Sequence, residues 1–158
     1  MAVPITKKGY ESLKAELDRL RKVERPKNIQ DIAEAREHGD LRENAEYKAA
    51  KEKQALLFSK LSRLKPYLTA IIIEKKEIGT EVVSLGTTVK LKDLVTQKVV
   101  SYTFVGPVEY ELEIYPSIVT YTSPLGKALV GKKKGESVDI ELPKQSTKFL
   151  ILDIVAAS

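Results

Sequence analysis

Apolar positions in the first half of the chain recur at the spacing of an α-helix. A first stripe, at intervals of three and four residues, consists of Tyr10, Leu13, Leu17 and Leu20. Thr6 precedes this stripe as a candidate N-cap, and residues 36–39 have the composition of a helix C-terminus. Pro26 lies within the predicted helix and lacks a backbone donor, so we expect a kink or local break there.

A second apolar stripe follows in the same half. It consists of Leu57, Leu61, Leu64 and Leu68, at spacings of four, three and four residues. Asp40 is the candidate N-cap of this second helix, and Pro66 predicts that the helix ends or kinks near Lys65. Two long helices joined by a turn of about one to three residues predict an antiparallel coiled-coil hairpin over residues 1–78, with its tip near residues 37–44.

The pattern changes in the second half of the chain. Runs rich in β-branched residues, with partial alternation, predict strands over residues 88–93, 99–105, 137–142 and 148–155. Among them, Ser123, Pro124 and Gly131 have the types expected for the N-cap, first residue and stop of a short helix. A helical hairpin followed by a compact domain of strands and helix, residues 79–158, predicts an α+β fold.

The composition is typical of a soluble globular protein, with 42% hydrophobic and 31% charged residues. We see no apolar run of membrane-spanning length and no signal-peptide pattern at the N-terminus. Cysteine is absent, and His38 is the only histidine. Disulfides, thiolate metal sites and Cys–His dyads are thereby excluded, and a reducing, cytoplasmic location is expected.

The charge is concentrated in the helical half. Residues 1–80 hold 18 Lys and Arg against 13 Asp and Glu, and therefore carry the whole net charge of +5. Residues 81–158 hold nine of each sign and are neutral. This asymmetry favours a polyanionic partner for the hairpin, although long exposed helices often carry mixed charge without one.

Two carboxylates stand together at the predicted hairpin tip. Asp40 and Glu43 are spaced i, i+3 and would share one face of a helix. Such a pair could contribute to a Mg²⁺ site, which takes oxygen ligands and needs further ligands from a partner. The same spacing fits a capping box, in which Asp40 caps the helix and Glu43 bonds back to a backbone N–H. From the pair alone, capping is the favoured interpretation.

Two longer motifs resemble a known family. Residues 34–47, EAREHGDLRENAEY, closely resemble the tip motif of the bacterial Gre transcript-cleavage factors, a family of transcription elongation factors, and in particular its GreA type. Residues 123–131, SPLGKALVG, are similar to the C-terminal signature of the same family. The two motifs occur in the expected order, and the resemblance covers essentially the whole chain.

The resemblance implies a role for the hairpin tip. The hairpin would enter the secondary channel of bacterial RNA polymerase and stimulate the polymerase's own cleavage of backtracked RNA, which rescues arrested complexes. Asp40 and Glu43 would help to hold a Mg²⁺ ion shared with the polymerase active site, so the chain alone would be neither an enzyme nor a stable metal binder. Arg36, Arg42 and Lys48 are candidate contacts to the nascent RNA 3′ end, although each alone is more typical of a solvated helix charge.

The resemblance also implies a role for the second domain. That domain would have an FKBP-like fold, without prolyl-isomerase activity, and would dock at the channel entrance. The docking segment would consist of Ser123, Pro124, Leu125 and Gly126. The free protein is expected to be a monomer.

Two departures from the family pattern leave alternatives open. Position 42 is commonly serine in active members and is Arg42 here, and position 48 is often histidine and is Lys48 here. Arg42 could pair with a tip carboxylate and weaken metal capture, or it could contact RNA. One alternative is therefore a Gre-like inhibitor that occupies the channel without promoting cleavage. Another is a hairpin adaptor that binds other helices and would tolerate loss of Asp40 and Glu43.

Overall fold

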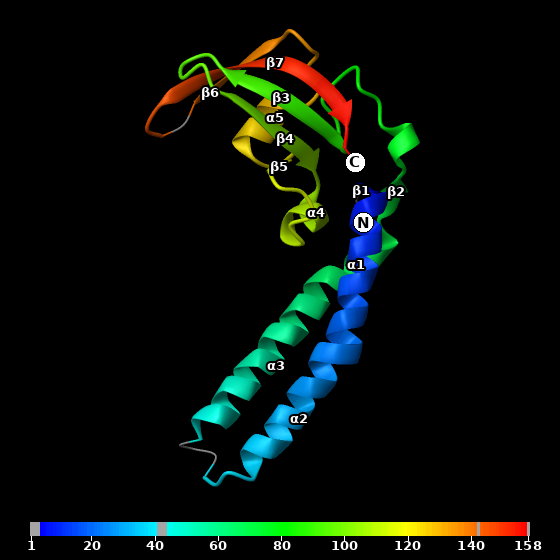
Figure 1. The fold of residues 1–158 in the computed structure, drawn as a ribbon, viewed down its shortest axis with the longest axis vertical. Helices are drawn as coiled ribbons and strands as arrows, with labels where there is room; N and C mark the ends of the chain where they lie inside the picture. Colours follow the sequence, from blue (N-terminus) through cyan, green and yellow to red (C-terminus); the bar gives the residue numbers. More distant parts are fainter. Residues whose placement is uncertain (1–3, 41–43, 142, 158) are drawn as a thin grey trace. The chain divides into compact units, whose positions relative to one another are not determined.

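The computed structural model describes residues 4–40, 44–141 and 143–157 (Figure 1). Backbone contacts divide the chain into two compact units, one of residues 11–69 and one of residues 1–10 together with 70–158. The first unit is helical and the second is rich in strands, which confirms the predicted α+β class. The division differs from the predicted boundary after residue 78, because residues 1–10 and 70–78 pack within the second unit.

The first unit is an antiparallel helical hairpin. Its elements are α1 (Lys7–Arg19) from residue 11 onward, the π-helical turn η1 (Leu20–Glu24), α2 (Arg25–Arg36), α3 (Ala45–Leu64) and the 3₁₀ helix η2 (Lys65–Thr69). Lys60 of α3 reaches Glu16 of α1 at 3.0 Å, and the Asn28 side chain of α2 donates to the Ala50 carbonyl of α3 at 2.9 Å. Residues later in the first arm thus pair with residues earlier in the second, as an antiparallel hairpin requires.

The local break predicted near Pro26 takes the form of a π-helical turn. The Arg25 amide donates to the Leu20 carbonyl, one residue farther back than in an α-helix. Proline has no amide to donate, and its ring crowds the carbonyl of the preceding turn, so a wider turn just before it is accommodated. The irregularity predicted near Lys65 is also confirmed, since α3 ends at Leu64 and gives way to η2.

The apolar core of the hairpin is narrow. Its buried side chains are Leu13, Leu17, Leu20, Ile32, Ala35 and Leu64. Most leucines of the second predicted stripe are only half-buried. One charged contact between the arms supplements this core, because the Glu16 carboxyl accepts a hydrogen bond from Lys60 of α3. Glu16 also accepts from Arg19 of its own helix, and this bond is the main cause that lowers the pKa of Glu16.

The second unit is built on a five-stranded sheet in the order β5-β4-β3-β7-β6. Its strands are β3 (Thr87–Asp93), β4 (Val99–Val105), β5 (Ile118–Thr120), β6 (Ser137–Glu141) and β7 (Ser146–Ala156). Neighbouring strands are antiparallel except for the parallel pair β4 and β5. The four predicted strands are confirmed to within two residues at each described end, while Leu142 lies outside the described residues.

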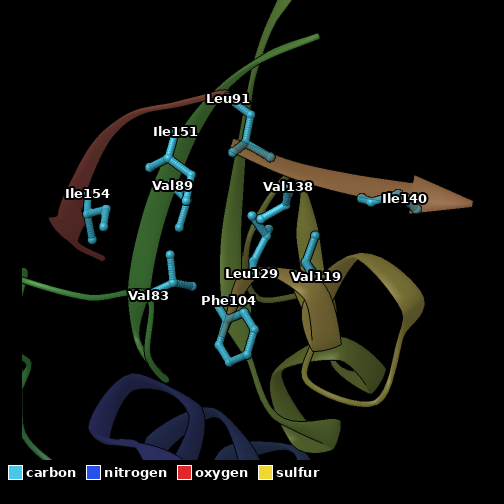
Figure 2. Close-up of a cluster of buried hydrophobic side chains, with 10 residues drawn as sticks. All are labelled: Val83, Val89, Leu91, Phe104, Val119, Leu129, Val138, Ile140, Ile151 and Ile154. Atoms are coloured by element: carbon cyan, nitrogen blue, oxygen red, sulfur yellow. The ribbon is translucent and has the colours of Figure 1, made fainter. Parts of the chain in front are cut away.

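One hydrophobic core holds the second unit together. Side chains from the sheet meet Leu129 of the short helix α5 (Pro124–Leu129), as Figure 2 shows. Its buried members are Val83, Val89, Leu91, Phe104, Val119, Leu129, Val138, Ile140, Ile151 and Ile154. Because one side of α5 packs on this core and Ser123 caps its start, the segment that carries the second family motif has a defined conformation.

Several short elements do not follow from the sequence pattern. They are β1 (Pro4–Thr6), β2 (Ile71–Ile73), β5, the 3₁₀ helix η3 (Lys75–Glu77) and α4 (Pro107–Glu111). Each is too short for a period to be recognised. Strands β1 and β2 pair in parallel, with Ile5 opposite Ile72, and this pairing brings the N-terminal residues into the second unit. No helix among the described residues is long and apolar enough to cross a membrane.

The start of α1 is fixed by a buried carboxylate. Thr6 is the N-cap as predicted, because its hydroxyl accepts from the Gly9 amide at 3.0 Å. Glu109 of α4 in turn accepts from the Thr6 amide at 2.9 Å and from the Thr6 hydroxyl at 3.1 Å. Glu109 is fully buried, and a Cβ added at Gly9 would lie only 2.7 Å from its carboxylate. The glycine therefore allows the carboxylate to approach the helix start.

Removing this carboxylate is expected to destabilise the second unit. Glu109→Ala leaves the Thr6 amide and hydroxyl without their acceptor, so the free energy of unfolding should fall by about 2–3 kcal/mol. Glu109→Gln is the matched control, because its amide oxygen still accepts and the loss should be smaller. Denaturant unfolding measures both variants. Equal midpoints for Glu109→Ala and the unmodified protein would mean that this contact contributes nothing.

Candidate functional site: the hairpin tip and the Ser123–Gly126 segment

The tip begins where α2 ends. The last helical residue is Arg36, and the amides of Glu37 and His38 still donate to carbonyls one turn back, at 3.1 Å each. Gly39 follows with φ of +115°, a region that favours glycine because other residues carry a Cβ that clashes there. Asp40 comes next and is exposed. A glycine in this conformation lets the chain leave the helix abruptly, which places Asp40 outside any helix.

The predicted cap of the second helix is wrong. Asn44, and not Asp40, is the N-cap of α3: its side-chain oxygen accepts from the Tyr47 amide at 2.9 Å. Asp40 therefore does not cap α3. Glu43, the other member of the predicted capping box, lies outside the described residues. Residues 37–44 separate α2 from α3, so the connection is also longer than the predicted turn.

Asn44 is favoured as the cap because the oxygen and the nitrogen of its side-chain amide each form a hydrogen bond. While its oxygen caps α3, its amide nitrogen donates to the Ala35 carbonyl near the end of α2. That second bond adds to the one that the same carbonyl accepts from the His38 amide, and it ties the start of α3 to the end of α2. The sequence contained a usable signal, since asparagine is among the best N-cap residues, but the contact to α2 could not be read from it.

Two further contacts brace the arms at the tip. The His38 ring nitrogen Nδ1 lies 2.6 Å from the Glu46 carboxylate. The Arg36 guanidinium lies over the Tyr47 ring, 5.9 Å from its centroid, within the range of a cation–π contact. Both contacts join the end of the first arm to the first turn of α3. The segment that contains Asp40 is therefore anchored at each end.

Two of the three residues predicted to contact RNA lie within the described residues. Arg36 and Lys48 are both exposed, in the last turn of α2 and the first turn of α3. Arg42 lies outside the described residues. Arg36 also contacts Tyr47, so its position is explained without RNA. Their proposed contact with RNA stays a prediction.

Of the two predicted metal ligands, only Asp40 lies within the described residues. Carboxylate oxygens are the ligands that Mg²⁺ prefers, and Asp40 is exposed where a partner could approach. Within residues 4–40, 44–141 and 143–157, no three His, Cys, Asp or Glu side chains form a group that could hold a metal. A Mg²⁺ ion held by Asp40 and Glu43 together with ligands of a partner stays a prediction.

The predicted docking segment builds the first turn of α5. The Ser123 hydroxyl accepts from the Gly126 amide at 3.0 Å and donates to the Thr120 carbonyl at 2.8 Å. Pro124 is the first helical residue and is exposed, whereas Leu125 packs against the hydrophobic core. Gly126 is buried. The predicted cap and first residue are confirmed, and only Pro124 of the four is fully exposed to a partner.

Comparison with known families decides the relationship. Residues 3–73 match the family model described as "Transcription elongation factor, N-terminal", and residues 78–156 match "Transcription elongation factor, GreA/GreB, C-term". The chain belongs to the GreA/GreB family of transcription elongation factors. The predicted resemblance is confirmed over both halves of the chain.

Individual members of the GreA/GreB family are similar over nearly the full length. The transcription elongation factor GreA of Pelobacter propionicus is 44% identical over 154 residues, covering 97% of this chain and 96% of that protein. GreA of Syntrophobacter fumaroxidans is 44% identical over 153 residues. Among solved structures, GreA factor homolog 1 (Gfh1) of Thermus thermophilus is 31% identical, covers 98% of this chain and 99% of that chain, and superposes with a TM-score of 0.44. The two sequence relatives show that the chain is a transcription elongation factor of the GreA type.

Within this GreA-type hairpin, Asn44 is expected to hold the tip. Asn44→Ala removes both the cap of α3 and the bond to Ala35, and should destabilise the first turn of α3 by about 1–2 kcal/mol. Asn44→Asp keeps the capping oxygen, so the first turn of α3 should lose less stability than in Asn44→Ala. Amide hydrogen exchange at Tyr47 and Lys48 measures the change, with the middle of α3 as an internal reference. Unchanged exchange in Asn44→Ala would contradict the assigned role.

Proposed function

We propose that this elongation factor binds bacterial RNA polymerase and inserts its hairpin into the secondary channel, where it stimulates the polymerase's cleavage of backtracked RNA. Arrested complexes would thereby be rescued in the cytoplasm. The observation that carries the proposal is an exposed Asp40 between the two helix ends of a braced tip, in a chain of the GreA/GreB family. An exposed carboxylate on a narrow hairpin can reach a site that a globular domain cannot enter.

Asp40 and Glu43 would together hold one Mg²⁺ ion, whose other ligands the polymerase supplies. When bound, such an ion activates water or stabilises the leaving oxygen in phosphodiester hydrolysis. The chain's own residues supply negative charge and position. The Asn44 bonds and the His38–Glu46 contact hold the ends of the tip segment, so that less conformational freedom is lost when Asp40 is placed.

Basic residues around the tip would assist by attracting RNA. Arg36, Arg42 and Lys48 lie close to Asp40 in the sequence, and the helical half of the chain carries the net charge of +5. Positive groups near a phosphodiester backbone raise affinity in a salt-dependent manner. We propose contact with the nascent RNA 3′ end by these three residues.

Arg42 favours one other candidate function. It stands between Asp40 and Glu43 in the sequence, and a guanidinium can pair with a carboxylate in a bidentate manner. If it neutralises one of them, the protein would occupy the channel without promoting cleavage. Arg42→Ser separates the candidates, because it should raise cleavage in an inhibitor and change it little in a cleavage factor.

Purified backtracked elongation complexes test the proposal directly. The protein is added to complexes with 3′-labelled RNA, and the release of short labelled fragments is followed, with polymerase alone as the control. We expect faster release and resumed elongation in the presence of nucleotides. Binding without faster release would support the inhibitor, and the absence of binding would contradict both candidates.

Docking is expected to depend on Pro124. This side chain is exposed at the first position of α5, and Ser123 caps the helix independently of it. Pro124→Ala should therefore leave the unit folded and weaken polymerase binding by roughly 5–10-fold, the loss typical of an important contact residue. Val130→Ala, an exposed apolar position at the other end of α5, is the control. If Pro124→Ala binds polymerase with unchanged affinity, Pro124 has no role in docking.

A further inference from the structure

A groove of about 610 Å³ runs along the hairpin between its two arms. We call its apolar lining residues the floor and its basic lining residues the rim. The floor includes Ile29 from α2 and Phe58 and Leu61 from α3. Phe58 is 72% exposed and Ile29 is 54% exposed, although both are large hydrophobic side chains. Apolar side chains gathered in an open groove on a polar hairpin mark a surface that another apolar group can cover.

The rim of this groove is basic. Arg21 and Arg25 line it from the first arm, and Lys51 and Lys65 line it from the second. The described residues that line the groove include no aspartate or glutamate. Arg21 forms an ion pair with Asp18 at 3.8 Å, and Asp18 does not line the groove. The groove thus combines an apolar floor with positive charge on both sides.

The dimensions suit a helix. Groove residues from Lys51 to Lys65 recur on one face of α3 over about 14 residues, which is roughly 21 Å of helix. An amphipathic helix binds such a groove by laying its apolar face on the floor, and helices pack about 8–10 Å apart in this way. Negative residues flanking the apolar stripe of that helix would face the four basic side chains.

We propose that the hairpin groove binds an acidic amphipathic α-helix of a partner protein. This inference goes beyond the tip-based function and does not depend on it. Charge complementarity selects this occupant. A second copy of the hairpin would bring the same four cations against themselves, and such like-charge contact is unfavourable. RNA would neutralise the rim but would leave the aliphatic part of the floor uncovered.

A designed peptide tests the proposal on the full-length protein. The probe is a fluorescein-labelled helical peptide of about 16 residues, with leucines at helical spacing and glutamates on both flanks. Its dissociation constant should be on the order of 10 μM and should rise with salt. Two control peptides, one with lysines replacing the glutamates and one with serines replacing the leucines, should bind at least about 10-fold more weakly.

Variants on the protein side assign the binding to the groove. Phe58→Ser and Arg25→Glu should each lower the affinity for the acidic peptide by at least about 5-fold. Leu56→Ser and Lys27→Glu are matched controls, because both residues are exposed on the same helices but do not line the groove. These controls should leave binding unchanged.

Four results overturn the proposal. The first is that the acidic peptide fails to bind, and the second is that the lysine peptide binds with equal affinity. The third is that the control variants lose as much affinity for the acidic peptide as the groove variants, and the fourth is that another molecule occupies the groove. The last is measured in two ways. A labelled single-stranded RNA whose affinity falls in both Phe58→Ser and Arg25→Glu would make the groove an RNA site. Sedimentation that shows a dimer abolished by Phe58→Ser would make it a self-association surface.

Discussion

Replacing Gly126 with alanine is expected to unfold the second unit or to destabilise it by more than about 3 kcal/mol. A Cβ at this position would lie 1.8 Å from the Thr120 carbonyl oxygen and 2.8 Å from its carbon. Both are backbone atoms, so no side-chain rotation can make room. The Thr120 carbonyl is also held by the Ser123 hydroxyl at 2.8 Å, so a shift that relieved the clash would break the cap of α5.

Gly79→Ala is the matched control for this substitution. Gly79 lies in the same unit, but nothing approaches a Cβ there within 4 Å, and the free energy of unfolding should change by no more than about 0.5 kcal/mol. Denaturant unfolding of the two variants, followed by near-ultraviolet circular dichroism of the tyrosines, measures the difference. A Gly126→Ala protein as stable as Gly79→Ala would mean that α5 does not pack against Thr120 as described.

The same contacts explain why a sequence motif is not a docking site by itself. Ser123 caps α5, Leu125 packs on the core, and Gly126 fits against the Thr120 backbone. Three of the four residues in the segment therefore have structural reasons for their identity. The sequence predicted the cap and the helix start correctly. The close approach of the Thr120 backbone to Gly126 arises from tertiary packing, which leaves no periodic pattern in the sequence.

Long periodic elements were the predictable part of the fold. The stripe from Leu13 to Leu20 and the two prolines predicted the hairpin arms and their irregularities, because helical spacing and a missing donor are local properties. The pairing of β1 with β2 could not be predicted in this way. It joins residues about 67 positions apart in strands of three residues, and only the folded chain brings them together.

At the tip, the sequence predicted the wrong N-cap for α3 for a different reason. Asp40 and Asn44 are both good N-cap types, and local rules do not choose between them. The choice is made by the bond from the Asn44 amide to the Ala35 carbonyl, which only an assembled hairpin can form. This outcome means that Asp40 does not cap α3, and the predicted role of its carboxylate is tested by transcript cleavage.

Asp40→Asn is accordingly expected to reduce stimulated transcript cleavage by about 100-fold, which corresponds to about 2.7 kcal/mol of transition-state stabilisation. The substitution removes a negative charge that would hold Mg²⁺, while the side chain keeps its shape. Because Asn44 caps α3, and because asparagine keeps the shape and the accepting oxygen of aspartate, the free energy of unfolding should change by no more than about 0.5 kcal/mol. Polymerase binding should be retained. Glu37→Gln is the control: it removes an exposed carboxylate from the same tip and should leave cleavage nearly unchanged.

The most direct measurement is the rate of RNA cleavage in backtracked complexes as a function of Mg²⁺ concentration, with saturating amounts of either the unmodified protein or Asp40→Asn. We expect Asp40→Asn to be inactive at limiting Mg²⁺ and partly restored at high Mg²⁺, since a weaker site fills only at higher ion concentration. Full activity of bound Asp40→Asn at limiting Mg²⁺ would contradict a metal-holding role for the tip carboxylate.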